Sequence, residues 1–280
     1  MVHKPCKHCK LIVQTKTTWA PVEYPKREAR LGTQVFAVAD KIWCIRRLSY
    51  FTCSYLVTTH EGLVFVDAGM DSGAKDLLQA LDVVGKKPAD VAGILLTHWH
   101  NDHAAGAKVV KELSNAPTYY HQMDEAFLTR KTAHHGWRGY LADHVPELGP
   151  LVLFKGLIGE ASPQAVDATR FIKHGEVLFD DFEVIETPGH TAGHLAFYCR
   201  SLKALFAGDA LAVINGRIRF MARPVTPDLP KSRKSAIDCL QFELESICPG
   251  HREPLTRNVK EECERFLQYA KSDAPWPLFG

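Results

Sequence analysis

The stretch Thr97-His98-Trp99-His100-Asn101-Asp102-His103 is the most informative part of the chain, because it places three histidines and one aspartate within six residues. The uncharged apolar run 91–96 before it contains β-branched residues and is typical of a buried strand. Residues 104–110 after it favour the opening turns of a helix. The cluster is therefore expected at the carboxyl end of a strand, where open α/β sheets usually bind ligands.

This spacing suits a metal ion. Side chains two residues apart on an extended or turn backbone point the same way, so His98 and His100 can reach one ion together. Asp102 and His103 follow after the chain has bent, and they can reach a second point nearby. Imidazole nitrogen with carboxylate oxygen suits zinc, and also iron, manganese or cobalt. A solvated polar turn is the alternative, but four donors in six residues favour a metal site.

Three further candidate donors follow short apolar runs later in the chain. His190 lies in Gly189-His190-Thr191, Asp209 in Gly208-Asp209-Ala210 and His251 in Pro249-Gly250-His251. The glycine before each donor lets the backbone turn sharply and approach a ligand closely. Donors at the ends of several strands can meet at one sheet edge, and a binuclear metal site can be assembled in this way from distant parts of the sequence.

In this order, the motifs His-x-His-x-Asp-His, Gly-His-Thr, Gly-Asp-Ala and Pro-Gly-His closely resemble those of the metallo-β-lactamase superfamily of metallohydrolases. The resemblance runs from about residue 40 to residue 251. It includes Val66-Asp67-Ala68-Gly69, which is similar to the family's early strand end with an aspartate. The resemblance implies an α/β (α+β) fold, a four-layer αββα metallo-β-lactamase-like sandwich, with the site at one edge of its two sheets.

The resemblance also implies a role for each donor and a cofactor of two zinc ions, with iron or manganese as alternatives. The first metal's ligands would be His98, His100 and His190, the second metal's would be Asp102, His103 and His251, and Asp209 would bridge the two. Asp102 is in addition the expected catalytic residue, because it can orient the nucleophile or relay its proton. Residues expected to hold the ligands in place from behind are Asp67, Thr97 and His194.

Length and composition limit what the whole chain can be. It has 280 residues, of which 24% are charged and 46% hydrophobic, as is ordinary for a globular protein. No apolar run approaches the roughly 18 residues that a membrane span needs. The formal net charge of +2 argues against a nucleic acid partner. Because the start of the chain lacks the apolar core of a signal peptide, the eight cysteines are interpreted as reduced thiols of a cytoplasmic protein.

We expect an N-terminal extension over 1–32, a hydrolase domain over 33–272 and a C-terminal tail over 273–280. Cys6-Lys7-His8-Cys9 in the extension is half of a zinc-ribbon spacing, but a polar extension without metal is the preferred interpretation. Strand-like runs over 34–66 predict a meander, and alternating strands and helices over 73–130 predict α/β layers. A later helix is expected at 235–245.

Two segments are candidates for substrate contact. Residues 132–163 contain Trp137 and Tyr140 and have no clean periodicity, which predicts an insertion that forms a lid or pocket wall; an ordinary surface loop is the alternative. Residues 217–234 contain six basic residues against one acidic residue. Arg217 and Arg219 are candidates to bind a substrate carboxylate or phosphate, although a solvated basic face is the commoner meaning of such a run.

The expected function is binuclear zinc-dependent hydrolysis of an ester-type bond, in a thioester, a lactone or a carboxyl ester of a small molecule. A hydroxide bridging the two metals would be the nucleophile. The Gly-Cys-Gly-Arg segment of glyoxalase II is absent after Asp209, which argues against glutathione thioesters. Phosphodiesterase and β-lactamase activities remain alternatives. Two other classes of protein are weighed. An iron oxidoreductase of the persulfide-dioxygenase type needs fewer metal ligands, and a non-catalytic scaffold protein with this fold usually lacks some of them. The complete set of seven donors argues against both.

Overall fold

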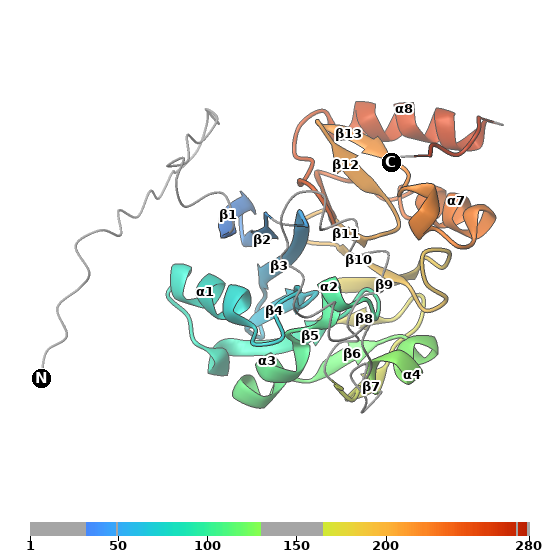
Figure 1. Cartoon of the computed structure of the whole chain (residues 1–280). Coiled ribbons are helices and arrows are strands. Elements are labelled where there is room, and N and C mark those ends of the chain that lie inside the picture. Colours follow the sequence, from blue (N-terminus) through green and yellow to red (C-terminus); the bar gives the residue numbers. More distant parts are fainter. Residues whose placement is uncertain (1–31, 49, 130–164, 273, 279–280) are drawn as a thin grey trace, which may run out of the picture.

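The first four strands form the antiparallel meander that the sequence predicts. They are β1 (Thr33–Ala39), β2 (Ile42–Arg47), β3 (Thr52–Thr58) and β4 (Leu63–Val66). The computed structural model describes residues 32–48, 50–129, 165–272 and 274–278 of the chain (Figure 1). The predicted extension over 1–32 therefore lies outside the described residues except for its last one, and the predicted insertion over 132–163 lies wholly outside them.

Three parallel strands complete this first sheet in the order β1 to β7. They are β5 (Val91–Leu95), β6 (Thr118–Tyr120) and β7 (Arg170–Phe171). Parallel neighbours require crossover connections. Helix α1 (Lys75–Val83) supplies the first, after which η1 (Pro88–Asp90) leads into β5. Helices α2 (Asn101–Ala104) and α3 (Ala107–Ser114) supply the second, and η2 (Gln122–Asp124) and α4 (Glu125–Leu128) follow β6.

The second sheet has the order β14-β11-β10-β9-β8. Its strands are β8 (Val177–Leu178), β9 (Phe182–Glu186), β10 (Leu195–Cys199), β11 (Ala204–Gly208) and β14 (Ser246–Pro249). A separate hairpin of β12 (Ala212–Ile214) and β13 (Arg217–Arg219) follows β11. The remaining elements are η3 (Arg223–Val225), α7 (Leu229–Asp238) and α8 (Val259–Lys271).

Three apolar clusters separate four layers, which confirms the predicted αββα sandwich. The central cluster joins the two sheets and includes Val64 and Leu95 from the first and Phe206 from the second. A second cluster packs α1 and α3 on the outer face of the first sheet. A third packs α7 and α8 on the outer face of the second sheet. Each sheet is thus covered by apolar residues on both faces, so side chains that bind a cation are expected at the strand ends or in the turns and short helices that follow them.

The predicted helix at 235–245 is wrong in position. The helix in this region is α7, which begins at Leu229 and ends at Asp238. The Asp228 carboxylate accepts a hydrogen bond from the Lys231 N–H, and Pro230 suits the first helical turn, so the start is set earlier than the apolar pattern indicates. The helix expected from residue 104 onward is α3, which begins only at Ala107; the end of the histidine cluster itself forms a separate short helix, α2, and residues 105–106 break the two apart.

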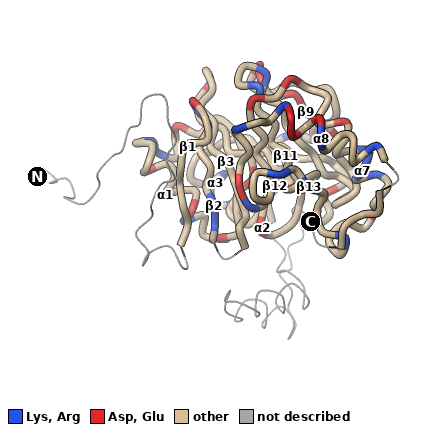
Figure 2. The backbone as a smooth tube through the Cα atoms, turned by 90° about the horizontal axis from the view of Figure 1, so that it is seen from above, with Lys and Arg blue, Asp and Glu red and all other residues tan. Residues whose placement is uncertain are grey.

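The described part of the C-terminal tail packs against the outer helical layer. The Trp276 ring stacks on Phe220 with centroids 4.0 Å apart, and its Nε1–H donates to the Met221 carbonyl over 2.9 Å. Basic and acidic residues are interspersed along the described chain (Figure 2). None of the described helices combines the length and the apolar character that crossing a membrane requires.

Candidate metal centre

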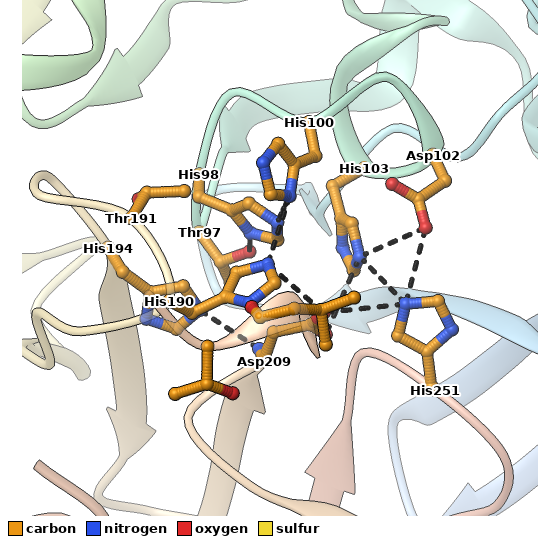
Figure 3. Close-up of polar contacts among 12 residues, drawn as sticks. Thr97, His98, His100, Asp102, His103, His190, Thr191, His194, Asp209 and His251 are labelled. Carbon is orange, nitrogen blue, oxygen red and sulfur yellow. Dashed lines mark hydrogen bonds and ion pairs between the residues drawn. The ribbon is translucent and has the colours of Figure 1, made fainter. Parts of the chain in front are cut away.

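The predicted donors come together where strands of both sheets end, each in or next to a turn after a strand (Figure 3). This arrangement follows from the fold, because only the strand ends carry polar residues past the apolar layers. Asp67 follows β4, His98 and His100 follow β5, Asp102 and His103 lie in α2, His190 follows β9, Asp209 follows β11 and His251 follows β14.

Three histidine nitrogens form the first group. His98 Nε2 lies 3.1 Å from His100 Nδ1, which lies 2.9 Å from His190 Nε2. A tetrahedral zinc with nitrogen ligands at 2.0–2.1 Å separates those nitrogens by about 3.3 Å, so the observed spacing is close to that of a metal site. These three side chains could hold one divalent cation.

Asp102, His103 and His251 form a second group beside the first. His251 Nε2 lies 3.2 Å from Asp102 Oδ2 and 3.4 Å from His103 Nε2. Asp209 lies between the groups (Figure 3), with its Oδ2 3.4 Å from both His190 Nε2 and His251 Nε2. Its Oδ1 is buried and has no hydrogen-bond partner among the described residues. A buried carboxylate oxygen that makes no hydrogen bond to a described residue, 3.6 Å from His103 Nε2 and between two donor groups, fits a pair of cations.

Hydrogen bonds behind the ligands set the tautomers of four histidines. His190 Nδ1 donates to the Val225 carbonyl over 2.6 Å, and His251 Nδ1 faces the Tyr50 carbonyl at 3.4 Å. Carbonyl oxygens only accept, so the proton must be on Nδ1 and the Nε2 lone pair is left for a cation. In His98 and His103, side chains instead of carbonyls place the proton on Nδ1.

Asp67 and Thr97 support His98 and His103 from behind. His103 Nδ1 donates to Asp67 Oδ2 over 2.8 Å. Asp67 Oδ1 also accepts the Thr97 N–H over 2.8 Å and the Thr97 hydroxyl over 2.9 Å. With its proton given to Asp67, Thr97 Oγ1 accepts from His98 Nδ1 over 3.0 Å. One buried carboxylate therefore orients a ligand in each group.

His194 lies directly behind Asp209. Its Nε2 accepts the Asp209 backbone N–H over 2.9 Å, and its Nδ1 lies 2.7 Å from the Thr187 hydroxyl. Both ring nitrogens are thus engaged, which leaves none for a cation. His194 holds the backbone of the carboxylate that lies between the two groups.

The two groups differ in charge before any metal binds. Burial lowers the pKa of His98 and His190, and it lowers the pKa of His100 to about 3. Burial also acts on His103 and His251, but the nearby carboxylates outweigh it, raising the pKa of His103 to about 9 and that of His251 well above its usual value. The first group is therefore neutral near pH 7, whereas the second must lose protons to bind a cation.

Asp124 is a site residue that the sequence reasoning missed. It is buried, and its Oδ2 accepts the Trp99 N–H while its Oδ1 accepts the Gly193 N–H, each over 3.1 Å. Asp124 thus joins the turn that carries His98 and His100 to the turn that carries His190. Burial raises the pKa of its carboxyl to about 6. Its position just after a strand of the same sheet is the only sequence signal for it.

Two glycines allow the turns to approach one another. A Cβ on Gly250 would lie 2.4 Å from Asp209 Oδ1 and 2.6 Å from the His103 ring. Gly208 has φ +49°, and a Cβ there would lie 2.8 Å from His194 Nε2. No larger residue fits at either position while the donors keep their places.

The candidate substrate residues are placed elsewhere or not described. Arg217 lies on β13 and pairs with Glu262 of α8 at 3.0 Å, and Arg219 is exposed on the same strand. No contact joins either residue to the donor groups within the described part of the chain. Trp137 and Tyr140 lie outside the described residues.

Comparison with known proteins gives a family and a fold. A family profile described as Metallo-beta-lactamase superfamily matches residues 50–251. The probable metallo-hydrolase YflN of Bacillus subtilis is 26% identical over 216 residues, which cover 70% of this chain and 77% of that protein. A hydroxyacylglutathione hydrolase of Bdellovibrio bacteriovorus is 28% identical over 151 residues, which cover 53% of this chain and only 43% of that enzyme.

Solved structures agree with this result. TTHA1623, crystallised in a di-iron-bound form, is 26% identical, with a TM-score of 0.56 over 77% of this chain and 95% of that one. A B3 metallo-beta-lactamase with an active-site glutamic acid is 21% identical, with a TM-score of 0.59 over 87% of this chain and 92% of that one. At this identity the second likeness shows the fold alone.

Proposed function

Because the chain belongs to the metallo-beta-lactamase superfamily, whose members are hydrolases, we propose that it is a binuclear zinc-dependent hydrolase of ester-type bonds in a small molecule. The observation that supports this most directly is the donor set. Six histidine and aspartate side chains form two groups around a seventh donor, Asp209, whose Oδ1 is buried without a hydrogen-bond partner among the described residues. A pair of divalent cations accounts for that arrangement.

The substrate class that we propose is a thioester, with a lactone or carboxyl ester as the next candidates. Relatives named hydroxyacylglutathione hydrolase support a thioester, although the chain spans less than half of their length. The sequence 210–217 lacks the Gly-Cys-Gly-Arg segment of glyoxalase II, so we propose a thiol portion other than glutathione.

The chain's own residues would prepare the site for hydrolysis. Bound divalent cations supply Lewis acidity and lower the pKa of coordinated water. Nearby His103 and His251 hold the pKa of the Asp102 carboxyl below its usual value despite burial, so Asp102 is ionised at neutral pH before any cation binds, and its carboxylate would orient the attacking water. The His98 and His103 side chains are fully buried, whereas His251 is 19% exposed, so we expect substrate to approach from the side of His251.

Iron is the alternative cofactor, because one similar structure holds two iron ions. An oxygen-using iron enzyme of the persulfide-dioxygenase type is the second candidate function. It requires only one metal, and the second donor group would then have no role.

Elemental analysis of the purified protein, with a panel of thioesters, lactones, carboxyl esters, phosphodiesters and a β-lactam, tests the proposal. We expect about two zinc ions per chain and turnover of one ester class. Asp209→Asn should abolish both, whereas Asp82→Asn, an exposed change on α1, should alter neither. About one iron per chain, oxygen uptake with a persulfide and no hydrolysis would refute it.

A further inference from the structure

An arginine and a phenylalanine come directly after two residues of the metal centre, the partly exposed ligand His251 and Tyr50. Arg252 directly follows the ligand His251, and its guanidinium lies 5.0 Å from the centre of the Phe51 ring. The Tyr50 carbonyl, one residue before Phe51, faces His251 Nδ1 at 3.4 Å. The pair is therefore adjacent in sequence to a ligand and to the group that orients it.

The backbone of both residues is held in a conformation that favours glycine. Arg252 has φ +80° and Phe51 has φ +54°. The Arg252 N–H donates to the Phe51 carbonyl over 2.7 Å, and the Arg252 carbonyl accepts from Arg46 Nη1 over 3.2 Å. A side chain at such a position costs of the order of 1 kcal/mol that glycine would avoid, and this kind of strain clusters at ligand-binding sites.

The Arg252 guanidinium is exposed and unpaired by any carboxylate of the described residues. Among the described residues, none brings a carboxylate within ion-pair distance of it, and the neighbouring Glu253 is turned toward the Gly216 N–H. By contrast, Arg217 is paired with Glu262. Stacking on Phe51 holds the cation near the surface, where its N–H fork meets no carboxylate of the described residues, and that fork matches a carboxylate or phosphate.

We propose that Arg252 and Phe51 form an anion-binding subsite that recognises a carboxylate or phosphate on the substrate, at a distance from the ester bond. The inference rests on the proposed hydrolase function and narrows it to anionic esters. It also assigns to Arg252 the role that the basic run 217–234 suggested for Arg217 and Arg219. Phe51 positions the guanidinium and covers one face of the bound group.

Matched substrates test the subsite in the metal-loaded enzyme. The S-phenyl thioesters of butyrate and of succinate differ only in that the succinate has a carboxylate where the butyrate has its terminal methyl group. The S-phenyl thioester of 3-phosphonopropionate has a phosphonate at the same place and tests recognition of a phosphate-like group. We expect KM at least about tenfold lower for one or both anionic thioesters than for the butyrate, with similar kcat and with a preference that shrinks as salt is raised.

The variants separate recognition from structure. Arg252→Gly suits the backbone, so it should abolish the preference without lowering Tm. Arg252→Lys should retain part of the preference, and Phe51→Leu should weaken it. Lys260→Ala removes an exposed charge from α8 and should change nothing. A preference that survives Arg252→Gly, or an equal loss with all three thioesters, would overturn the proposal.

Failure of the hydrolase proposal is distinguished by binding. If none of the thioesters is hydrolysed, calorimetric titration of the metal-loaded protein with the anilides of succinate and butyrate measures binding affinity at the subsite without turnover. Tighter binding of the succinate anilide that Arg252→Gly removes supports the subsite. Equal affinity of wild type for both anilides refutes it.

Discussion

Replacing Asp67 by asparagine should weaken cation binding without disturbing the fold. The Asp67 carboxylate accepts three hydrogen bonds, from His103 Nδ1 and from the N–H and hydroxyl of Thr97. Asparagine tolerates the left-handed backbone of this position, φ +62°, so the change removes charge and one acceptor but adds no backbone strain. The asparagine also turns its NH₂ group toward one of these three donors. At least one hydrogen bond to a charged acceptor is therefore lost.

One such bond contributes about 1.5–3 kcal/mol. That range corresponds to roughly a 10- to 100-fold loss of cation affinity, which is also the usual effect of removing a group that orients a metal-binding histidine. The loss should fall mainly on the second group, because His103 bonds to Asp67 directly and His98 only through Thr97.

Competition with a chromogenic chelator, titrated with zinc at pH 7.5, measures the two affinities separately. Asp82→Asn serves as the control, since Asp82 is exposed at the end of α1. Equal affinities for wild type and Asp67→Asn would refute the reasoning. So would a loss confined to the first equivalent of zinc, because it would mean that His98, rather than His103, depends on Asp67.

Three further outcomes follow from the site. The pKa of His103 near 9 means that a cation displaces its proton below that pH, so affinity for the second zinc equivalent should rise between pH 7 and 9 by up to about tenfold per pH unit for that proton. His251, whose pKa is also raised, adds to this slope, whereas the first equivalent, whose His100 has a pKa near 3, should show little change in a chelator titration. Gly250→Ala should lower the free energy of unfolding by about 1–3 kcal/mol by denaturant titration, because its Cβ would meet Asp209. The pKa of Asp124 is raised from 3.8 to about 6, so its stabilising contribution is complete below pH 3.8 and lost as pH rises through 6; the stability of wild type relative to Asp124→Asn should fall by up to about 3 kcal/mol over that range, and a parallel pH dependence in the two proteins would contradict this.

The fold class could be predicted because its signals are local. Apolar runs with period two or with no polar residue mark strands, and a donor directly after such a run marks a strand end. The αββα sandwich is what the resemblance of the donor motifs implies, because apolar runs alone do not fix how the layers stack. Helix boundaries failed where a short-range contact outweighed the apolar pattern, as at Asp228, whose carboxylate starts α7 ahead of the predicted position.

The sequence by itself determined which residue types could bind a metal and that each follows a strand. Only the tertiary structure decided how these residues divide between the two donor groups, because a sheet edge brings together residues more than a hundred positions apart. The distance between Asp209 and its neighbours, the Val225 and Tyr50 carbonyls that set two tautomers, and the Asp124 link all depend on such non-local contacts. The pairing of Arg252 with Phe51 belongs to the same class, since no local pattern relates a strand end to a distant turn.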